Sequence, residues 1–502
     1  MENSSPFRFP FDNTYARDLP GFYVPCQPEP VRQPKLLHFN QDLARELGLD
    51  PGLGLDQGAL GAEALAALFS GNRLPAGAAP IAQAYAGHQF GHFAPQLGDG
   101  RALLLGEVID RQGRRRDIAF KGSGRTPFSR NGDGKAAVGP MLREVLIGEA
   151  MHALGIPTTR ALAVVATGES VRRDGPLPGA VLTRVAASHL RVGTFEFFSA
   201  HAGREQVRQL ADYTLARHHP QLLDTEHPYL GLLRAVAEDQ AALIARWMQV
   251  GFIHGVMNTD NMSLAGETID YGPCAFMEAY DPSAVFSSID RHGRYAYGQQ
   301  PAIARWNLAR FAETLLPLLA DDEEGAVALA SEVIDAFPQR YRQHWLAGMG
   351  AKLGLATVGV EDGALLEDWL ELLQAQRVDY TQGWRYLADA AEGRAEPLHG
   401  LFAEPQPLVA WLARWQRRCA AEEGQSGADR AAGMRRVNPW LIPRNHRVEA
   451  ALAAASDDGD LGAFAQLLEA LKQPYVENPG LAFLAEPASP AFMATFRTFC
   501  GT

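Results

Sequence analysis

Apolar and polar positions follow different periods in two parts of the chain, which separates a strand-rich region from a helical one. Polar or glycine-containing turns separate apolar runs of strand length at residues 102–110, 117–124, 161–169 and 179–186. Before the third run, residues 139–156 repeat apolar positions with the helical period, and Pro140 occupies the first turn. The first part is therefore predicted to be a β-rich unit that contains one important helix.

From residue 188 onward the pattern becomes mainly helical. Amphipathic periods predict helices at residues 205–218, 229–250, 304–319, 447–456 and 461–472, with further helices after residue 323. No internal repeat or low-complexity linker marks another independent domain. We therefore expect the C-terminal segment to dock on this helical part.

Three earlier segments are less regular. Residues 1–34 are rich in proline and aromatic residues and are expected to cover the surface without forming a core. Residues 36–69 carry helical stretches, with Asn40 as a candidate N-cap. Residues 85–101 mix glycine, histidine and aromatic residues without a strand or helix period, which predicts a long shaped loop.

Composition and charge restrict the functional classes. Of 502 residues, 47% are hydrophobic and 21% charged, as in ordinary soluble proteins, and this length requires two or three packed units. An excess of 58 acidic over 46 basic residues gives a net charge of -12, which argues against nucleic acid or an anionic membrane as the main partner. We find no membrane-spanning run and no signal or transit pattern, and four cysteines make no disulfide framework, so a cytoplasmic location is expected.

The candidate chemistry is concentrated in residues 251–274, GFIHGVMNTDNMSLAGETIDYGPC. The carboxylates of Asp260 and Asp270 and the amide of Asn261 suit a hard divalent cation and a phosphate-bearing substrate. Protein kinases hold their metal with an Asn that ends an H-R-D-x-x-x-x-N loop and an Asp that opens a D-F-G triplet. His254 and Asn261 fit the first pattern, and the triplet DYG at Asp270 fits the second.

The kinase catalytic base is missing from this loop. The Asp that takes the proton from the acceptor hydroxyl should stand two residues after His254, where this chain has Val256. Valine cannot accept a proton, whereas Asp260, beside a candidate metal ligand, can. The alternative for Asp260 is an Asx-turn residue that only shapes the loop.

A glycine turn and a strand lysine indicate a nucleotide site. Residues 98–101, GDGR, lead into a strand and expose N–H groups to phosphate, although Leu103 replaces the third glycine of G-x-G-x-x-G and a plain strand entry is the alternative. Lys121 ends the second strand, like the lysine that kinases pair with a Glu on the next helix. Periodicity does not choose between Glu144 and Glu149 for this pairing, and a solvated surface position is the alternative for either.

Two arginines and two histidines leave alternatives open. Arg184 and Arg191 flank the start of the helical part and suit a polyphosphate, but isolated arginines usually face solvent. His88 and His92 have the i, i+4 spacing of metal ligands, yet the surrounding glycines and Pro95 disfavour a helix. We expect these histidines to pack or form hydrogen bonds.

The motifs YAGHQFG, QLGDGRA, HGVMNTDNM, DYGPC and NPWLIPRNH, with Lys121 and the helix glutamate, resemble the selenoprotein O family of protein adenylyltransferases from about residue 7 onward. The resemblance implies a bacterial member with a pseudokinase fold of the α+β class. Its small, β-rich lobe with one key helix would span residues 76–187, and its large, mainly helical lobe with a C-terminal helical extension would span 188–502. Residues 1–75 would be an N-terminal extension that packs on the lobes of a monomer.

The resemblance further implies that ATP lies inverted relative to a kinase, so that the α-phosphorus faces a protein Ser, Thr or Tyr hydroxyl and AMP is transferred. The residues that would contact the nucleotide, carried over by position, are Gly98, Gly100, Arg101, Lys121, Asp133, Gly134, Arg184, Arg191 and Asp270. Glu144 would orient Lys121. Asn261 and Asp270 would ligate Mg²⁺, with Mn²⁺ as an alternative, and Asp260 would accept the proton.

The family also suggests redox links. Redox-homeostasis proteins are suggested as acceptors only through the resemblance. Cys500 stands where eukaryotic relatives carry selenocysteine, and Cys274 follows the DYG triplet. A regulatory Cys274–Cys500 bond is one hypothesis, and free thiols in a reducing cytoplasm are the other.

Two other functional classes remain to be distinguished. An ordinary phosphotransferase acting on a protein or small molecule is disfavoured because position 256 carries valine. A catalytically silent nucleotide-binding scaffold is disfavoured because Lys121, Asn261 and Asp270 are all present.

Overall fold

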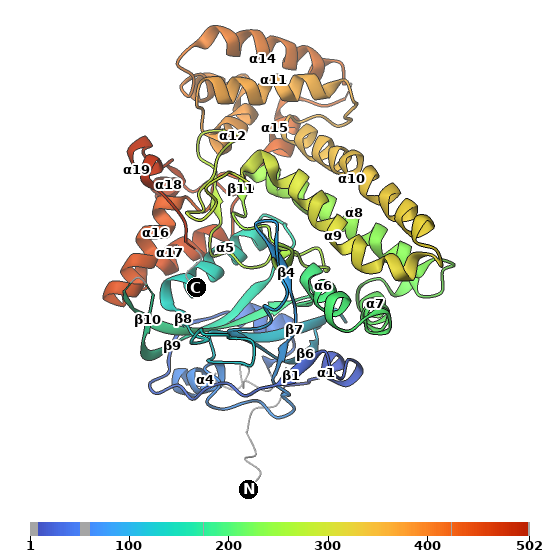
Figure 1. The fold of residues 1–502 in the computed structure, drawn as a ribbon. Coiled ribbons are helices and arrows are strands. Elements are labelled where there is room, and N and C mark those ends of the chain that lie inside the picture. Colours follow the sequence, from blue (N-terminus) through green and yellow to red (C-terminus); the bar gives the residue numbers. More distant parts are fainter. Residues whose placement is uncertain (1–8, 51–60, 174, 423, 500–502) are drawn as a thin grey trace.

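The structure is a computed structural model that describes residues 9–50, 61–173, 175–422 and 424–499. An antiparallel sheet occupies the first part of the chain, and helices form most of the remainder (Figure 1). The predicted mixture of α and β structure, with a sheet region before a helical region, is confirmed.

The sheet is built around the strands that the apolar runs predict. Its strands are β1 (Tyr23–Pro25), β2 (Lys35–Phe39), β3 (Ile81–Gln83), β6 (Ala102–Ile109), β7 (Arg115–Lys121), β8 (Ala136–Ala137), β9 (Arg160–Arg172) and β10 (Pro176–Ala186). They follow the order β1-β3-β6-β7-β10-β9-β2, with β8 paired to β10. The register places Lys121 opposite Ala102 on one side and Leu182 on the other. Lys121 therefore projects from a strand that is held on both edges.

Successive residues of β7 serve the two faces of the sheet. Ile118 and Phe120 belong to one buried cluster and Ala119 to another, as the two-residue period of a strand requires. Helices α2 (Gln41–Glu46) and α4 (Ala62–Phe69) supply side chains to the first cluster. Helix α5 (Val138–Ala153) covers the other face, and twelve of its sixteen residues are buried.

The N-terminal segment corrects one expectation. Helix α1 (Thr14–Asp18) and the residues after it contribute Tyr15, Leu19 and Phe22 to the main core, each 2% exposed or less. Strand β1 extends the sheet by pairing with β3. The prediction that residues 1–34 only cover the surface is wrong, because their aromatic side chains close the edge of this core. Asn40 accepts a hydrogen bond from the Leu43 amide, so the predicted N-cap is confirmed.

The helical part agrees closely with the predicted periods. Its helices are α6 (Val192–His201), α7 (Arg204–His218), α8 (Pro228–Val250), α9 (Gln300–Leu319), α10 (Glu323–Lys352), α11 (Asp362–Ala375), α12 (Tyr380–Ala391), α13 (Glu396–His399), α14 (Pro405–Ala420), α15 (Gly427–Arg435), α16 (Asn445–Ala453), α17 (Gly462–Leu471), α18 (Ala482–Ala485) and α19 (Pro490–Thr495). Across the described ranges, no helix has both the length and the apolar character needed to cross a bilayer.

The C-terminal helices contact both regions. Helices α16 and α17 pack on α5, and the ring of Phe464 lies edge-on to His38 with 6.0 Å between centroids. Arg444, which is fully buried, donates to Asp379 over 2.6 and 3.0 Å and also to Glu278. The prediction that the C-terminal segment docks on the helical part was therefore incomplete. The segment also covers the apolar face of α5 that the sheet leaves open.

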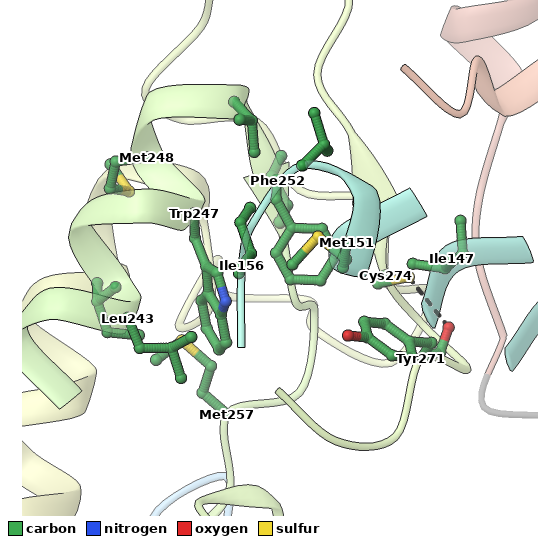
Figure 2. Packing of buried hydrophobic residues seen from close by; sticks show 14 of the residues in the cluster. Ile147, Met151, Ile156, Leu243, Trp247, Met248, Phe252, Met257, Tyr271 and Cys274 are labelled. Atoms are coloured by element: carbon green, nitrogen blue, oxygen red, sulfur yellow. Dashed lines mark hydrogen bonds between the residues drawn. The ribbon is translucent and has the colours of Figure 1, made fainter. Parts of the chain in front are cut away.

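A continuous apolar layer joins α5 to α8 (Figure 2). Ile147 and Met151 approach from α5, Trp247 from α8, and Phe252 lies between them. The Trp247 indole donates a hydrogen bond of 2.9 Å to Thr268 Oγ1. The layer thus packs against the segment that leads to Asp270 and holds it to α8.

Lys352 is a buried cation at the end of α10. Its Nζ lies 4.9 Å from the ring centre of Trp384 and 5.8 Å from that of Tyr380, and burial lowers its pKa to about 7. The pKa of an unfolded lysine is ~10.4. Between pH 7 and that pKa, the unfolded chain therefore binds more protons than the folded one. Stability should therefore rise as pH increases from 7 towards 10.

Replacing Lys352 should remove that pH dependence. Urea unfolding at pH 7 and pH 9 is expected to show a gain of roughly 2 kcal/mol for the wild type, and Lys352→Met should lose most of it. Lys35→Met, at an exposed end of β2, is the matched control and should keep the wild-type slope. An unchanged slope in Lys352→Met would contradict this assignment.

Candidate active site

A cleft of about 1020 Å³ runs between the sheet and the segment 256–273. Every predicted site residue lines it: Gly98, Gly100, Arg101, Lys121, Asp133, Gly134, Glu144, Arg184, Arg191, Asp260, Asn261 and Asp270. Residues separated by more than 150 positions in the chain therefore face one cavity.

Lys121 connects the sheet, α5 and the DYG triplet. Its Nζ lies 2.6 Å from Glu144 Oε1 and 2.5 Å from Asp270 Oδ1. Glu149 instead binds Arg160 through two hydrogen bonds of 2.8 and 2.9 Å. The structure thus decides between the two glutamates: Glu144 is the partner of Lys121, and neither is a solvated surface residue.

Asp270 lies at the centre of a cationic cluster. Arg184 Nη1 is 2.8 Å from its Oδ1, and Arg191 Nη1 is 3.8 Å from its Oδ2. Burial opposes ionisation, but Lys121 and these two arginines hold the Asp270 pKa well below its usual range. Its φ of +64° is a left-handed conformation that costs a non-glycine residue free energy and often marks functional sites.

The loop after β11 (Phe252–Ile253) carries the other carboxylate. Asp260 and Asn261 belong to the 3-10 turn η2 (Thr259–Asn261). Burial raises the Asp260 pKa to about 6, and no described group forms a hydrogen bond with its buried Oδ1. His254 donates a hydrogen bond of 2.9 Å through Nε2 to the Ile269 carbonyl, which ties this loop to the residue before Asp270. Val256 is buried at the position of the kinase base.

The residues present fit a cation that is shared with a phosphate. The described parts of the chain contain no cluster of three His, Cys, Asp or Glu side chains able to hold a metal alone. Mg²⁺ commonly takes one or two protein oxygens and completes its shell with water and substrate phosphate. Asn261 binds the Val256 carbonyl through Nδ2 at 3.0 Å, which leaves its Oδ1 for a ligand. Together with Asp270 Oδ2, it would give such a partial site.

Packing requires glycine in the turn at residues 98–100 and at the loop that faces it. Gly98 has a φ of +68°, and a Cβ there would lie 2.3 Å from the Phe128 ring. At Gly134, also with a φ of +68°, a Cβ would lie 2.0 Å from the Gly124 carbonyl oxygen. Asp133, next to it, pairs with Arg173 at 2.9 Å. This side of the cleft is therefore a tightly closed pair of loops.

Residues 85–101 contain a feature that the sequence patterns missed. Strands β4 (Gly87–Gln89) and β5 (His92–Ala94) form a short hairpin, so the prediction of a long loop without strands is wrong. Strands this short show no measurable period. His88 Nδ1 lies 2.5 Å from Glu196 Oε1, which confirms the hydrogen-bonding role expected for it. Gln89, in the same hairpin, donates a hydrogen bond from its side-chain amide to Asp260 Oδ2.

Of the two cysteines in the proposed disulfide, only Cys274 lies in the described part of the chain. Cys274 is buried, burial raises its thiol pKa to about 12, and its Sγ lies 3.1 Å from the Tyr271 carbonyl oxygen (Figure 2). Cys500 lies outside the described residues. Thr498 nevertheless donates a 2.6 Å hydrogen bond to the Pro273 carbonyl, so the tail passes beside Cys274.

Comparison with known proteins agrees with this geometry. The family model described as protein adenylyltransferase SelO matches residues 7–472. The chain belongs to the SelO family. Relatives called protein nucleotidyltransferase YdiU include that of Chromobacterium violaceum, 61% identical over 485 residues, which are 96% of this chain and 100% of the relative. That of Cereibacter sphaeroides is 60% identical, over 98% of this chain and 100% of the relative. That of Rhizobium leguminosarum bv. trifolii is 56% identical, over 100% and 99% respectively. The predicted family and nucleotidyltransferase class are confirmed.

For a SelO family member, the Lys121–Glu144 pair should support nucleotide binding. Glu144→Gln removes one anionic partner of Lys121 and leaves its ammonium drawn to Asp270 alone. We expect Mg-ATP to bind about tenfold more weakly, a change of ~1.4 kcal/mol, in titration calorimetry. Glu371→Gln, on the exposed side of α11, is the control and should bind as the wild type does. Equal dissociation constants for Glu144→Gln and wild type would exclude this role.

Proposed function

We propose that the chain transfers AMP from ATP to Ser, Thr or Tyr hydroxyls of proteins, with Mg²⁺ as the required cation and Mn²⁺ as an alternative. Two observations together carry the proposal. Val256 is buried at the position of the kinase base, and Asp260 has a buried carboxylate oxygen that forms no hydrogen bond with the described residues. No carboxylate stands at the position of the kinase base, and the Asp260 carboxylate lines the same cleft, which supports its role as the alternative proton acceptor. Family membership supports nucleotidyl transfer as the chemistry.

A protein-kinase-like, two-lobed fold is part of this proposal. Residues 76–187, with the central strands and α5, would be the small lobe, and residues 188–502 the large lobe with its helical extension. Residues 1–75 would be an N-terminal extension whose strands join the small-lobe sheet. The cleft lies between the sheet and residues 254–261, here called the catalytic loop, and this position supports the division.

The nucleotide is proposed to lie inverted relative to a kinase. Lys121, Arg184 and Arg191 form the cationic end of the cleft and would hold the phosphates that leave as pyrophosphate. Gly98, Gly100 and Arg101 would follow the nucleotide, and Asp133 and Gly134 would meet its other end, at the loop pair that closes the cleft. The α-phosphorus would then stand before Asp260.

The chain's own residues account for the remaining chemistry. Transfer through a loose transition state depends mostly on positioning and on neutralising the phosphate charge. A cation held by Asn261 and Asp270 would neutralise phosphate charge when bound. The cationic cluster stabilises the negative charge that develops on the leaving pyrophosphate. The Asp260 carboxylate accepts the proton of the acceptor hydroxyl as the new P–O bond forms and the bond to the leaving pyrophosphate breaks.

Further elements of the proposal concern the cellular setting. We infer a cytoplasmic monomer with redox-homeostasis proteins among its acceptors. A Cys274–Cys500 bond would link the tail to the segment after the DYG triplet, and the hydrogen bond between Thr498 and Pro273 supports this link.

Isotope position separates the three functional classes. With ATP labelled at the α-phosphate, acid-stable label should stay on casein or on the chain itself, and with label at the γ-phosphate it should not. Retention from γ would indicate a kinase, and retention from neither a nucleotide-binding scaffold. UTP labelled at the α-phosphate, run in parallel, reports the base preference.

Substitution of the proposed base gives a second test. Asp260→Asn removes the proton acceptor but keeps the size of the side chain, so kcat should fall roughly 10²- to 10⁴-fold. The calorimetric Kd for ATP should stay within about threefold of wild type, because the cationic cluster is intact. Asp224→Asn, on the exposed surface, is the control. Wild-type turnover in Asp260→Asn would refute the assignment and restore the Asx-turn interpretation.

A further inference from the structure

The β4–β5 hairpin contacts the catalytic loop at three consecutive loop residues. The Phe90 amide donates to Asn258 Oδ1 at 3.1 Å, and the His88 amide donates to Thr259 Oγ1 at 2.7 Å. The Gln89 side-chain amide donates to Asp260 Oδ2 at 3.4 Å. The two segments are therefore joined by three hydrogen bonds, and the carboxylate proposed as base is one of the joined groups.

The Thr259 hydroxyl holds this junction to α6. It accepts the His88 hydrogen bond and donates its own proton to Glu196 Oε2 at 2.5 Å. Glu196 Oε1 in turn lies 2.5 Å from His88 Nδ1, which closes a ring of three residues that includes the His88 backbone amide. Thr259 is 0% and Glu196 5% exposed, so water does not compete for these bonds. A hydroxyl is the group that can both donate and accept at this point.

The hairpin also packs against both oxygens of Asp260. A Cβ built on Gly87 would lie 2.5 Å from Asp260 Oδ1 and 2.9 Å from Asp260 Cβ, so only glycine lets the strand approach the carboxylate this closely. Oδ1 is buried beside Gly87, and the Gln89 amide donates to Oδ2. The hairpin thus fixes the carboxylate from both sides.

The turn of the hairpin is strained and held from the same side. Phe90 has a φ of +52°, which is rare for a bulky residue and is kept only where the surroundings enforce it. Its amide binds Asn258 and also the Tyr295 hydroxyl at 3.1 Å. The Tyr295 hydroxyl donates to the same Asn258 oxygen at 2.6 Å. The conformation therefore depends on contact with the catalytic loop.

We propose that the β4–β5 hairpin is the positioning element for Asp260. Gly87 and Gln89 fix the orientation of the carboxylate towards the acceptor hydroxyl, and the Thr259–Glu196–His88 ring keeps the hairpin in place. This inference rests on the proposed role of Asp260 as base. Gln89 and Thr259 act through Asp260 and are positioning residues.

The test compares variants in steady-state transfer from α-labelled ATP to casein. Gln89→Leu removes the amide donor at a half-buried position, and Thr259→Val removes the hydroxyl with almost no change of shape. Both should lower kcat about 10- to 100-fold, as expected when a catalytic group is misplaced by a fraction of an ångström. The KM and calorimetric Kd for ATP should stay within about twofold. Thr259→Ser keeps a hydroxyl and should restore kcat to within about threefold of wild type.

The controls separate this inference from the proposed function and from misfolding. Gln221→Leu, the same change at an exposed site, should behave as the wild type. Thermal unfolding is measured for every variant, and Gln89→Leu, at the less buried site, keeps the test valid if Thr259→Val unfolds. An active wild type with unchanged kcat in Gln89→Leu would overturn the positioning role alone. An equal loss in Thr259→Ser and Thr259→Val would do the same. A wild type that transfers no α-label would overturn the proposed function and with it this inference.

Discussion

The contact between Lys121 and Asp270 is the interaction on which the site depends. Lys121 stands on a central strand, and Asp270 follows a segment fixed to α8 through Trp247 and Thr268. Their 2.5 Å contact joins the sheet to the DYG triplet. Buried charges are stable only when they are paired and hydrogen-bonded, so both regions must be correctly folded before this pair can form.

The charge around this pair is not balanced within the protein. Among the described residues that line the cleft, nine lysine and arginine side chains face the four carboxylates of Asp133, Glu144, Asp260 and Asp270. This excess of positive charge attracts phosphate groups. Next to Asp270, Lys121, Arg184 and Arg191 hold its pKa low despite burial. The cleft is thus electrostatically prepared for a polyphosphate before any ligand arrives.

Much of this arrangement could be predicted from the sequence, and the failures have physical causes. The long strands and helices have clear periods, and the residues of the cleft stand in recognisable motifs, so they could be located in advance. The choice between Glu144 and Glu149 could not be made, because α5 is buried on nearly all sides and its pattern does not reveal which face meets β7. Tyr15 and Phe22 were misplaced because an irregular aromatic segment gives no sign that it closes a core.

The hairpin and the C-terminal segment show a second kind of limit. Strands of three residues, such as β4 and β5, are too short to show alternation, and their value lies in long-range hydrogen bonds to Asn258 and Thr259. Likewise, α16 and α17 cover α5, which is about 300 positions earlier in the chain. Periodicity describes which face of an element is apolar but not which distant element will cover it.

The orientation of the nucleotide is the central claim, and a crystal structure with Mg²⁺ and a non-hydrolysable ATP analogue would test it most directly. Inverted binding predicts that the β- and γ-phosphates contact Lys121 and Arg184, with the α-phosphorus facing the Asp260 carboxylate and the base near Asp133. A γ-phosphorus that faces Asp260, with the base buried at the opposite end, would contradict the claim and return the chain to kinase chemistry.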